Sequence, residues 1–174
     1  MPQLIPAWVD GRLMPVEKLE VHRRGLRHPA VSVFVLDGDR TLIQRRAATK
    51  YHSPGLWANA CCTHPRWGED AATCAVRRLR EELGITEPSL ELRDRIEYRA
   101  AVGDGMVEHE QVELFTAEAG PGLAITPDPA EVMDVRWIAL AALHAEVAER
   151  PYAFTPWLRI YLAEHAARIF GRAA

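Results

Sequence analysis

The sequence predicts a single α+β domain built around a mixed β-sheet, and three observations favour this class. The chain has 174 residues, 48% of them hydrophobic, which suits one compact domain of roughly 100–200 residues. Apolar side chains recur with strand spacing in some segments and with helix spacing in others. These segments do not alternate regularly, as the βαβ units of a parallel sheet do.

The first expected elements are strands joined by tight turns. Residues 7–15 (AWVDGRLMP) have the pattern of a short hairpin around Asp10-Gly11, and residues 30–46 have that of two strands joined at DGD. Asp-Gly supports the positive φ angles that tight hairpins need. Apolar residues occupy both faces of the segment AVSVFVL, so this strand is expected to be covered on both sides.

Helical spacing begins at residue 69. Ala72, Ala75, Leu79 and Leu83 recur every three or four residues, and Gly84 is a natural end for this helix. Further along the chain we expect strands at about 90–100, 106–117 and 132–138, and helices at 140–149 and 155–170.

The composition argues against several classes of protein. A net charge of −3 does not suit a nucleic-acid binder, which normally has a basic face. The longest apolar stretch, AVSVFVL, is far shorter than the ~20 residues that span a bilayer, and MPQLIPAWVD reaches an Asp too early for a signal peptide. Three cysteines make a poor disulfide framework. We expect a cytoplasmic protein with reduced thiols and with no nucleic-acid or membrane partner.

The segment THPRWGEDAATCAVRRLREELGI (63–85) resembles the Nudix box, G-x5-E-x7-R-E-U-x-E-E-x-G-U, where U is aliphatic. The residues that match it are Glu69, Arg77, Leu79, Glu81, Glu82, Gly84 and Ile85. There are two departures: Thr63 replaces the first Gly, and Arg78 replaces the Glu of the RE pair.

Arg78 changes the chemistry that this resemblance implies. Nudix hydrolases bind several divalent ions with the carboxylates of this helix and direct water onto a pyrophosphate. Arg78 lies four residues before Glu82, on the same helical face, and a cation there repels metal. We expect one Mg²⁺ at Glu82 with a guanidinium beside it, which would hold a diphosphate but cut it poorly. The alternative is an ordinary surface ion pair, worth ~0.3–0.5 kcal/mol.

Beyond the box, the chain resembles the type I isopentenyl diphosphate isomerases. The matching segments are VHRRGLRHPAVSVFV (21–35), QRRAATKYHSPGLWANACCTHPRWGE (44–69), RRLREELGI (77–85), YRAAVGDGMVEHE (98–110) and FTPWL (154–158). The resemblance implies a Nudix-type mixed sheet sandwiched between helices, in one domain over residues 1–174. Residues 1–28 would form an N-terminal hairpin or helix extension that contributes metal ligands. The implied reaction is the reversible conversion of isopentenyl diphosphate to dimethylallyl diphosphate.

That reaction moves a double bond by one carbon through a tertiary carbocation. It needs a proton donor and a proton acceptor, a dry cavity with an electron-rich surface, and a holder for the diphosphate. In MVEHEQVELF, the strand period places Glu108 and Glu110 on one face among apolar neighbours. Two carboxylates so close raise each other's pKa unless a cation lies nearby. The alternative for this segment is a solvated edge strand.

The resemblance also implies a metal centre in which Glu108 and Glu110 join His22, His28 and His64. Glu110 would handle a proton as well. Imidazole and carboxylate ligands suit Mg²⁺, Mn²⁺ or Zn²⁺ without choosing among them. The remaining histidines, His52, His109, His144 and His165, have no place in this arrangement.

In the segment ANACCTHP, Cys62 is interpreted as the thiol that handles the second proton, and Cys61 as a neighbour packed away from the site. A Cys–His nucleophile pair is disfavoured because a metal-bound imidazole cannot accept a proton from the thiol. A simple core-filling role remains the alternative for both cysteines. The sequence leaves open whether Cys62 or Glu110 protonates the alkene.

The substrate is expected to be held at both ends. Arg46 and Lys50 match the family's diphosphate-binding positions, and Arg78 is expected to join them from the helix, although a solvated basic turn is the alternative. By the same resemblance, the backbone carbonyl of Cys62 joins Glu82 in binding Mg²⁺. Trp157 and Tyr98 are candidates for facing the carbocation.

We therefore expect an isomerase of a C5 isoprenoid diphosphate that needs Mg²⁺ and a second divalent ion, as a monomer or a weak homodimer. The first alternative is a Nudix pyrophosphohydrolase acting on a nucleotide. The second is a non-catalytic, metal-stabilised domain that binds diphosphates or a protein partner. The identity of the metal held by the histidines, the oligomeric state, the downstream pathway and the role of residues 1–20 are not set by the sequence.

Overall fold

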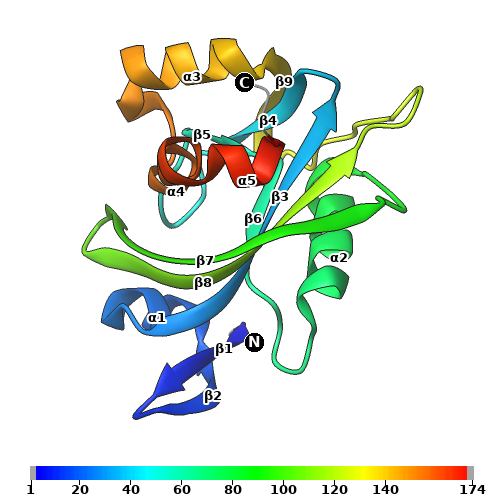
Figure 1. The fold of residues 1–174 in the computed structure, drawn as a ribbon. Coiled ribbons are helices and arrows are strands. Elements are labelled where there is room, and N and C mark those ends of the chain that lie inside the picture. Colours follow the sequence, from blue (N-terminus) through cyan, green and yellow to red (C-terminus); the bar gives the residue numbers. More distant parts are fainter. Residues whose placement is uncertain (1–2, 172–174) are drawn as a thin grey trace.

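A computed structural model describes residues 3–171 as an α+β structure with a mixed sheet, as predicted. The strands are β1 (Leu4–Val9), β2 (Arg12–Glu17), β3 (Arg27–Asp37), β4 (Arg40–Arg46), β5 (Trp57–Asn59), β6 (Cys61–Thr63), β7 (Leu90–Gly103), β8 (Met106–Glu118) and β9 (Val132–Ala139). The helices are α1 (Lys18–Arg24), α2 (Ala71–Leu83), α3 (Leu140–Glu149), α4 (Pro156–Ile160) and α5 (Ala166–Phe170). Helix α2 lies on one side of the central strands and α3, α4 and α5 on the other (Figure 1), so the expected sandwich is confirmed.

The main sheet has the strand order β5-β4-β3-β8-β7, with β6 beside β3 and β9 beside β4. Strands β3 and β8 are parallel, and the other pairs are antiparallel. Strand β8 lies between β3 and β7. It is therefore an interior strand, and the solvated edge strand is excluded as its interpretation.

Strand β3 is covered on both faces, as its two apolar faces predict. Val31, Val33 and Val35 belong to the core that α2 covers, together with Leu79 and Leu83. The alternate residues, Ala30 and Phe34, belong to a second core that includes Trp157, Leu158 and Tyr161 near the C-terminus. Each face of one strand thus serves a different helical layer.

The sheet divides in its middle, at a place that the sequence pattern does not reveal. Strands β3 and β4 pair only at Leu36–Thr41 and Asp37–Arg40. Beyond that point β6 pairs with β3, and β5 pairs with β4. The buried Asn59 amide ties the two halves together by donating to the carbonyl oxygens of Val33 at 3.0 Å and Cys61 at 2.8 Å. Strands β5 and β6 were not predicted, because three residues are too few to show an alternation.

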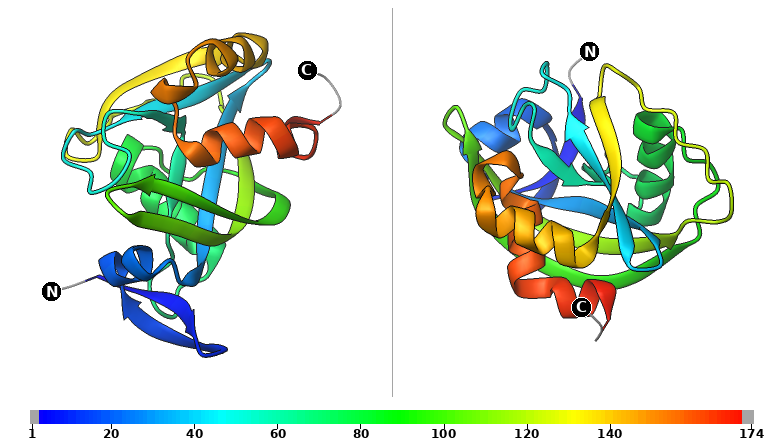
Figure 2. Two further views of the ribbon diagram at one scale, coloured as in Figure 1. Left: turned by 90° about the vertical axis from the view of Figure 1, so that its left-hand side faces the viewer. Right: turned by 90° about the horizontal axis from the view of Figure 1, so that it is seen from above.

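The N-terminal extension is a hairpin followed by one short helix, and Figure 2 shows it below the main sheet. Asp10 and Gly11 turn the hairpin with φ angles of 49° and 78°, as the Asp-Gly pair predicts. The Glu17 carboxylate accepts hydrogen bonds from the first backbone N–H groups of α1. The helix buries Val21 and His22, so the extension brings an imidazole to the sheet.

Two predicted helices differ from the structure at their ends or in their interior. Helix α2 begins at Ala71 rather than at residue 69, because the Asp70 side chain caps it by accepting from the Thr73 N–H at 2.9 Å. The helix expected over 155–170 is interrupted by a π turn over Tyr161–His165, which separates α4 from α5. Such turns are frequent at functional sites. None of the helices within residues 3–171 is long and apolar enough to cross a bilayer.

Candidate active site and metal centre

A narrow cavity of about 30 Å³ gathers most of the predicted site residues. Its lining includes Arg46, Lys50, Cys62, His64, Arg78, Glu82, Glu108, Glu110 and Trp157. A water molecule needs about 10–15 Å³ of such space, so the cavity has room for only a few waters. A five-carbon diphosphate enters it only after the surrounding side chains or loops move.

Sheet register places the reactive side chains side by side. Cys62 on β6 is paired with Ser32 on β3, and His28 on β3 is paired with Glu110 on β8. Tyr98 on β7 is the opposite neighbour of Glu110. Four adjacent strands therefore bring a thiol, a hydroxyl, an imidazole, a carboxylate and a phenol to the same region.

Glu108 and Glu110 are both buried, with exposed fractions of 2% and 0%. The Tyr98 hydroxyl lies 2.7 Å from Glu108 Oε2 and 2.8 Å from Glu110 Oε2. A phenol has one proton and can donate it to one carboxylate at a time. Burial and then the charge of Glu110 raise the pKa of Glu108. Burial opposes ionisation of Glu110 too, but the imidazoles of His28 and His64, whose Nε2 atoms lie 3.6 Å and 2.9 Å from Glu110 Oε1, outweigh it and lower the pKa of Glu110.

Three of the predicted metal-binding histidines meet Glu110. His22, His28, His64 and Glu110 each offer one ligand atom, and these atoms lie within 4.8 Å of one another. The Nδ1 atoms of His22 and His28 lie 2.7 Å from the carbonyl oxygens of Lys18 and Leu26, which leaves the Nε2 atoms to face a metal. The Tyr51 hydroxyl lies 3.5 Å from His22 Nε2. His28 Nε2 is buried without a hydrogen-bond partner among the described residues. This donor set fits a divalent metal ion.

Glu108 belongs to a neighbouring set rather than to that one. Its partners are His22 and His52, and their ligand atoms also lie within 4.8 Å of one another. The expectation that His52 has no place in the site is therefore wrong. No sequence signal identified it, because His52 lies in the loop after β4, where no periodicity predicts which way a side chain points. His109 lies outside the site, 2.9 Å from Glu97 on the exposed side of β8.

Cys62 and Cys61 point to opposite sides of the sheet. Cys62 lines the cavity with Glu110, whereas Cys61 is packed in the core under α2, with its sulfur 3.9 Å from Glu82 Oε1. Burial, followed by the charges of Glu110 and Glu108, raises the pKa of Cys62. Its sulfur accepts a hydrogen bond from Ser32 Oγ at 3.2 Å, and Ser32 Oγ lies 2.9 Å from the Tyr161 hydroxyl.

Glu82 is buried and already paired. Arg78 Nη2 lies 2.6 Å from Glu82 Oε1, and Gln44 Nε2 lies 2.8 Å from Glu82 Oε2. The guanidinium of Arg78 also lies 3.2 Å from Glu131, which forms a second ion pair with Lys50. An ordinary surface pair does not describe this arrangement, because Glu82 is 5% exposed.

The basic residues around the cavity are not a solvated turn. The Arg46 guanidinium is buried 5.1 Å from the Trp157 ring centre, while its neighbour Arg45 is exposed. Lys18 also lines the cavity and is a cation that the sequence analysis missed. Burial, with the charges of Lys50 and Arg78, lowers the pKa of Lys18 to about 8. Several cations held this close together are suited to a multiply charged anion.

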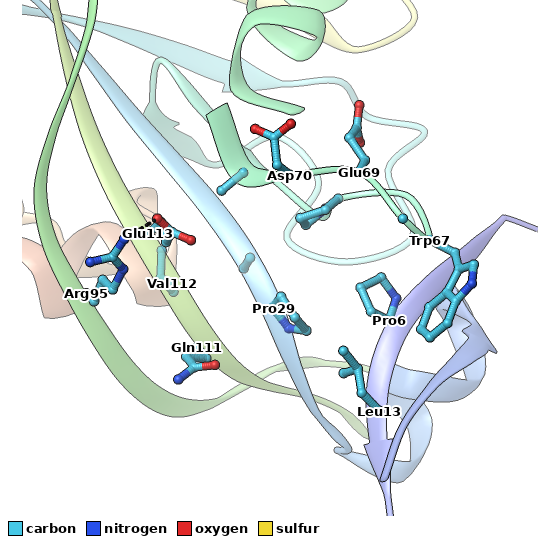
Figure 3. Close-up of a pocket in the computed structure, with 14 residues that line it drawn as sticks. Pro6, Leu13, Pro29, Trp67, Glu69, Asp70, Arg95, Gln111, Val112 and Glu113 are labelled. Atoms are coloured by element: carbon cyan, nitrogen blue, oxygen red, sulfur yellow. Dashed lines mark hydrogen bonds and ion pairs between the residues drawn. The ribbon is translucent and has the colours of Figure 1, made fainter. Parts of the chain in front are cut away.

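A wider pocket of about 620 Å³ lies elsewhere, between the N-terminal hairpin, β3, β8 and the start of α2 (Figure 3). Its charged side chains already have partners. Arg95 is paired with Glu113, Glu69 with Arg77, and Asp70 caps α2. Pro6, Leu13, Pro29 and Trp67 supply much of the remaining wall. The narrow cavity is the candidate active site, because it is the one that brings Cys62 and Glu110 together.

Comparisons with known sequences identify close relatives over the whole chain. The sequence pattern of the NUDIX domain matches residues 26–158. A protein of Cereibacter sphaeroides (strain KD131 / KCTC 12085) named isopentenyl-diphosphate Delta-isomerase is 66% identical over 172 residues, covering 99% of this chain and 97% of the relative. A protein of the same name from Dinoroseobacter shibae is 64% identical over 174 residues, covering 100% of this chain and 99% of the relative.

Solved structures support the fold alone. The crystal structure of a Deinococcus radiodurans protein matches with a TM-score of 0.73 at 14% identity, covering 96% of this chain and 98% of the other. A MutT NUDIX hydrolase from Burkholderia pseudomallei matches with a TM-score of 0.62 at 21% identity, covering 80% of this chain and 98% of the other.

Proposed function

The chain belongs to the isopentenyl-diphosphate Delta-isomerase family, on a Nudix fold, and we propose how it interconverts isopentenyl diphosphate and dimethylallyl diphosphate. The observation that carries the mechanism is that Cys62 and Glu110 line one buried cavity. A thiol and a carboxylate on the walls of a water-poor space can add a proton to one carbon and remove one from another.

In this mechanism the hydrocarbon tail lies between Cys62 and Glu110. One group protonates the terminal alkene carbon, which leaves a tertiary carbocation, and the other removes a proton from the carbon nearer the diphosphate. The raised pKa of Cys62 keeps the thiol protonated, and the lowered pKa of Glu110 keeps the carboxylate ionised, as a proton acceptor must be. Trp157 and Tyr98 border the reacting centre and offer π electrons to the cation.

A divalent metal held by His22, His28, His64 and Glu110, with Glu108 turned to it from the neighbouring set, would supply the positive charge that two buried carboxylates require. The protein's own contribution is to orient this centre. The backbone carbonyls of Lys18 and Leu26 fix two of the imidazole rings. The Tyr98 hydroxyl holds the two carboxylates together.

The diphosphate end is held by Arg46, Lys50 and Arg78, and Lys18 joins them. Glu82 and the carbonyl oxygen of Cys62 would hold Mg²⁺ at the same place. Glu131 now neutralises Lys50 and Arg78, so an incoming diphosphate takes over from a carboxylate that is already there. This exchange of one anion for another supports binding without leaving a cation unpaired.

We further propose a cytoplasmic protein whose residues 1–174 form one domain, with the extension over residues 1–28 contributing His22 and His28. It would act as a monomer or a weak homodimer on a small diphosphate. The nucleotide pyrophosphohydrolase remains the second candidate on the fold alone, but Arg78 stands where such an enzyme has a further metal-binding glutamate.

Incubation of the protein with isopentenyl diphosphate, Mg²⁺ and Mn²⁺ in D₂O tests the reaction. We expect NMR to show dimethylallyl diphosphate with deuterium in its new methyl group, because the added proton comes from an exchangeable group. Free phosphate should stay at background. Unchanged substrate, or phosphate release from a nucleoside diphosphate compound under the same conditions, would contradict the proposal.

Replacing Ser32 with alanine is expected to lower turnover by about tenfold while KM stays within a factor of two. The Ser32 hydroxyl is the hydrogen-bond donor to the Cys62 sulfur, and a hydrogen bond to a developing negative charge is worth ~1.5 kcal/mol or more. Steady-state kinetics measures both constants. Tyr161→Phe should have a smaller effect in the wild type and none in Ser32→Ala, because Tyr161 reaches the sulfur only through Ser32. If the losses of turnover from the two substitutions were additive, Tyr161 would not act through Ser32.

A further inference from the structure

His52 is a buried imidazole that the mechanism above leaves unused. It is 4% exposed, although it lies in the loop that joins β4 to β5. Its ring stacks on His22 with centroids 5.4 Å apart and meets the Trp157 ring edge-on at 5.8 Å. The ring also lines the cavity that Cys62 and Glu110 share.

The loop backbone is held in a way that directs this ring inward. Arg46 Nη2 donates to the His52 carbonyl oxygen at 3.1 Å, and Arg46 Nε donates to the Ser53 carbonyl oxygen at 3.2 Å. Ser53 has a φ of 47°, a left-handed conformation that strains a residue with a side chain. A buried guanidinium thus stabilises a strained turn, and strain of this kind concentrates where a side chain must be placed for function.

The ligand atoms around His52 have the spacing of a metal site. His52 Nε2 lies 3.5 Å from Glu108 Oε1, and both atoms lie within 4.8 Å of a ligand atom of His22. His22 binds the Lys18 carbonyl through Nδ1, so its Nε2 faces both sets of ligands. His52 Nδ1 lies 3.5 Å from Ser53 Oγ, the kind of outer contact that orients a metal-binding imidazole.

We propose that His52 is a further imidazole ligand of the metal centre, on the side of Glu108. The inference rests on the proposed metal centre at His22, His28, His64 and Glu110. It makes the centre richer in nitrogen donors, with four imidazoles beside two carboxylates. Such a set favours a transition-metal or zinc ion over Mg²⁺, which prefers oxygen ligands.

Titration of metal-free protein with Co²⁺ tests this role, because the visible absorption of Co²⁺ reports ligation by imidazole without any need for turnover. We expect His52→Ala and His52→Gln to bind Co²⁺ about 10- to 100-fold more weakly than the wild type. Mg²⁺ competition should show that the preference for Co²⁺ over Mg²⁺ falls as well. His109→Ala is the matched control, because His109 pairs with a glutamate on the exposed side of β8, and it should bind as the wild type does.

Thermal unfolding of the metal-free variants checks that each one is folded. His52→Gln keeps most of the buried volume and serves if His52→Ala does not fold. Wild-type Co²⁺ affinity and an unchanged spectrum in both variants would overturn the role of His52 while leaving the metal centre standing. A wild-type protein that binds no Co²⁺ would overturn the centre and this inference together.

Discussion

Replacing Cys62 with alanine is expected to lower the turnover of isopentenyl diphosphate by about 100- to 10,000-fold, the range typical of a lost proton-transfer group. The thiol faces the cavity beside Glu110. The neighbouring thiol of Cys61 cannot replace it, because Cys61 packs in the core on the other side of the sheet. KM should change little, because the diphosphate is held by the cations and not by the sulfur. Steady-state rates followed by NMR measure both effects.

The matched control for this prediction is Cys74→Ala. Cys74 is another buried thiol, but it lies on α2 in the core on the opposite side of the sheet. Its loss should lower stability by about 1 kcal/mol and leave turnover within a factor of two. A Cys62→Ala protein that keeps more than a tenth of wild-type turnover would remove the thiol from the mechanism.

The carboxylate pair is the part of the site that the sequence predicts best. Met106, Glu108, Glu110 and Val112 alternate with other residues along one strand, and period-two spacing is visible without a structure. The structure places these side chains on one buried face. What spacing alone does not show is that β8 is interior. Its pairing with β3 and β7, together with the side chains of Tyr51 and Trp157 that line the same cavity, keeps solvent away from both carboxylates.

The histidines illustrate the opposite case. His22, His28 and His64 are spread over more than forty residues, and only the resemblance to a known family grouped them. Neither spacing nor the resemblance predicted His52, because the direction of its side chain is set by hydrogen bonds from Arg46 to the loop backbone. Contacts between a side chain and distant carbonyl oxygens leave no local pattern in a sequence. The same holds for Lys18, which a helix brings to the cavity from the N-terminal extension.

Arg78 shows how a departure from a family pattern carries information. A cation beside Glu82 was expected from helical spacing, and the two side chains are in contact. The acidic partner of Arg78 and Lys50 was not expected, because Glu131 comes from the turn before β9, far along the chain. Because Glu131 already pairs with Lys50 and Arg78, these cations are in place before substrate arrives. A diphosphate must therefore compete with the Glu131 carboxylate for them.

Replacing Glu110 with glutamine is expected to lower both turnover and metal affinity, whereas Cys62→Ala should lower turnover alone. Turnover should fall at least as far as in Cys62→Ala, because an amide cannot accept the proton that the carboxylate takes. Metal affinity should fall by about 10-fold or more, because the amide is neutral and a poorer ligand. Its NH₂ group would also face His64 Nε2, which lies 2.9 Å from Glu110 Oε1. Co²⁺ titration and isotope exchange measure the two losses separately.

Glu113→Gln is the matched control on the same strand. Glu113 forms a partly exposed ion pair with Arg95, so its replacement should change turnover, metal affinity and stability little. Glu110 contacts both Tyr98 and His64, and we assign it two roles, proton transfer and metal binding. Comparing the two variants separates these roles. Cys62→Ala should bind metal as the wild type does. If Glu110→Gln also binds metal normally but has lost turnover, Glu110 acts in proton transfer and not as a metal ligand. Retention of both properties would remove Glu110 from the metal centre and from proton transfer alike.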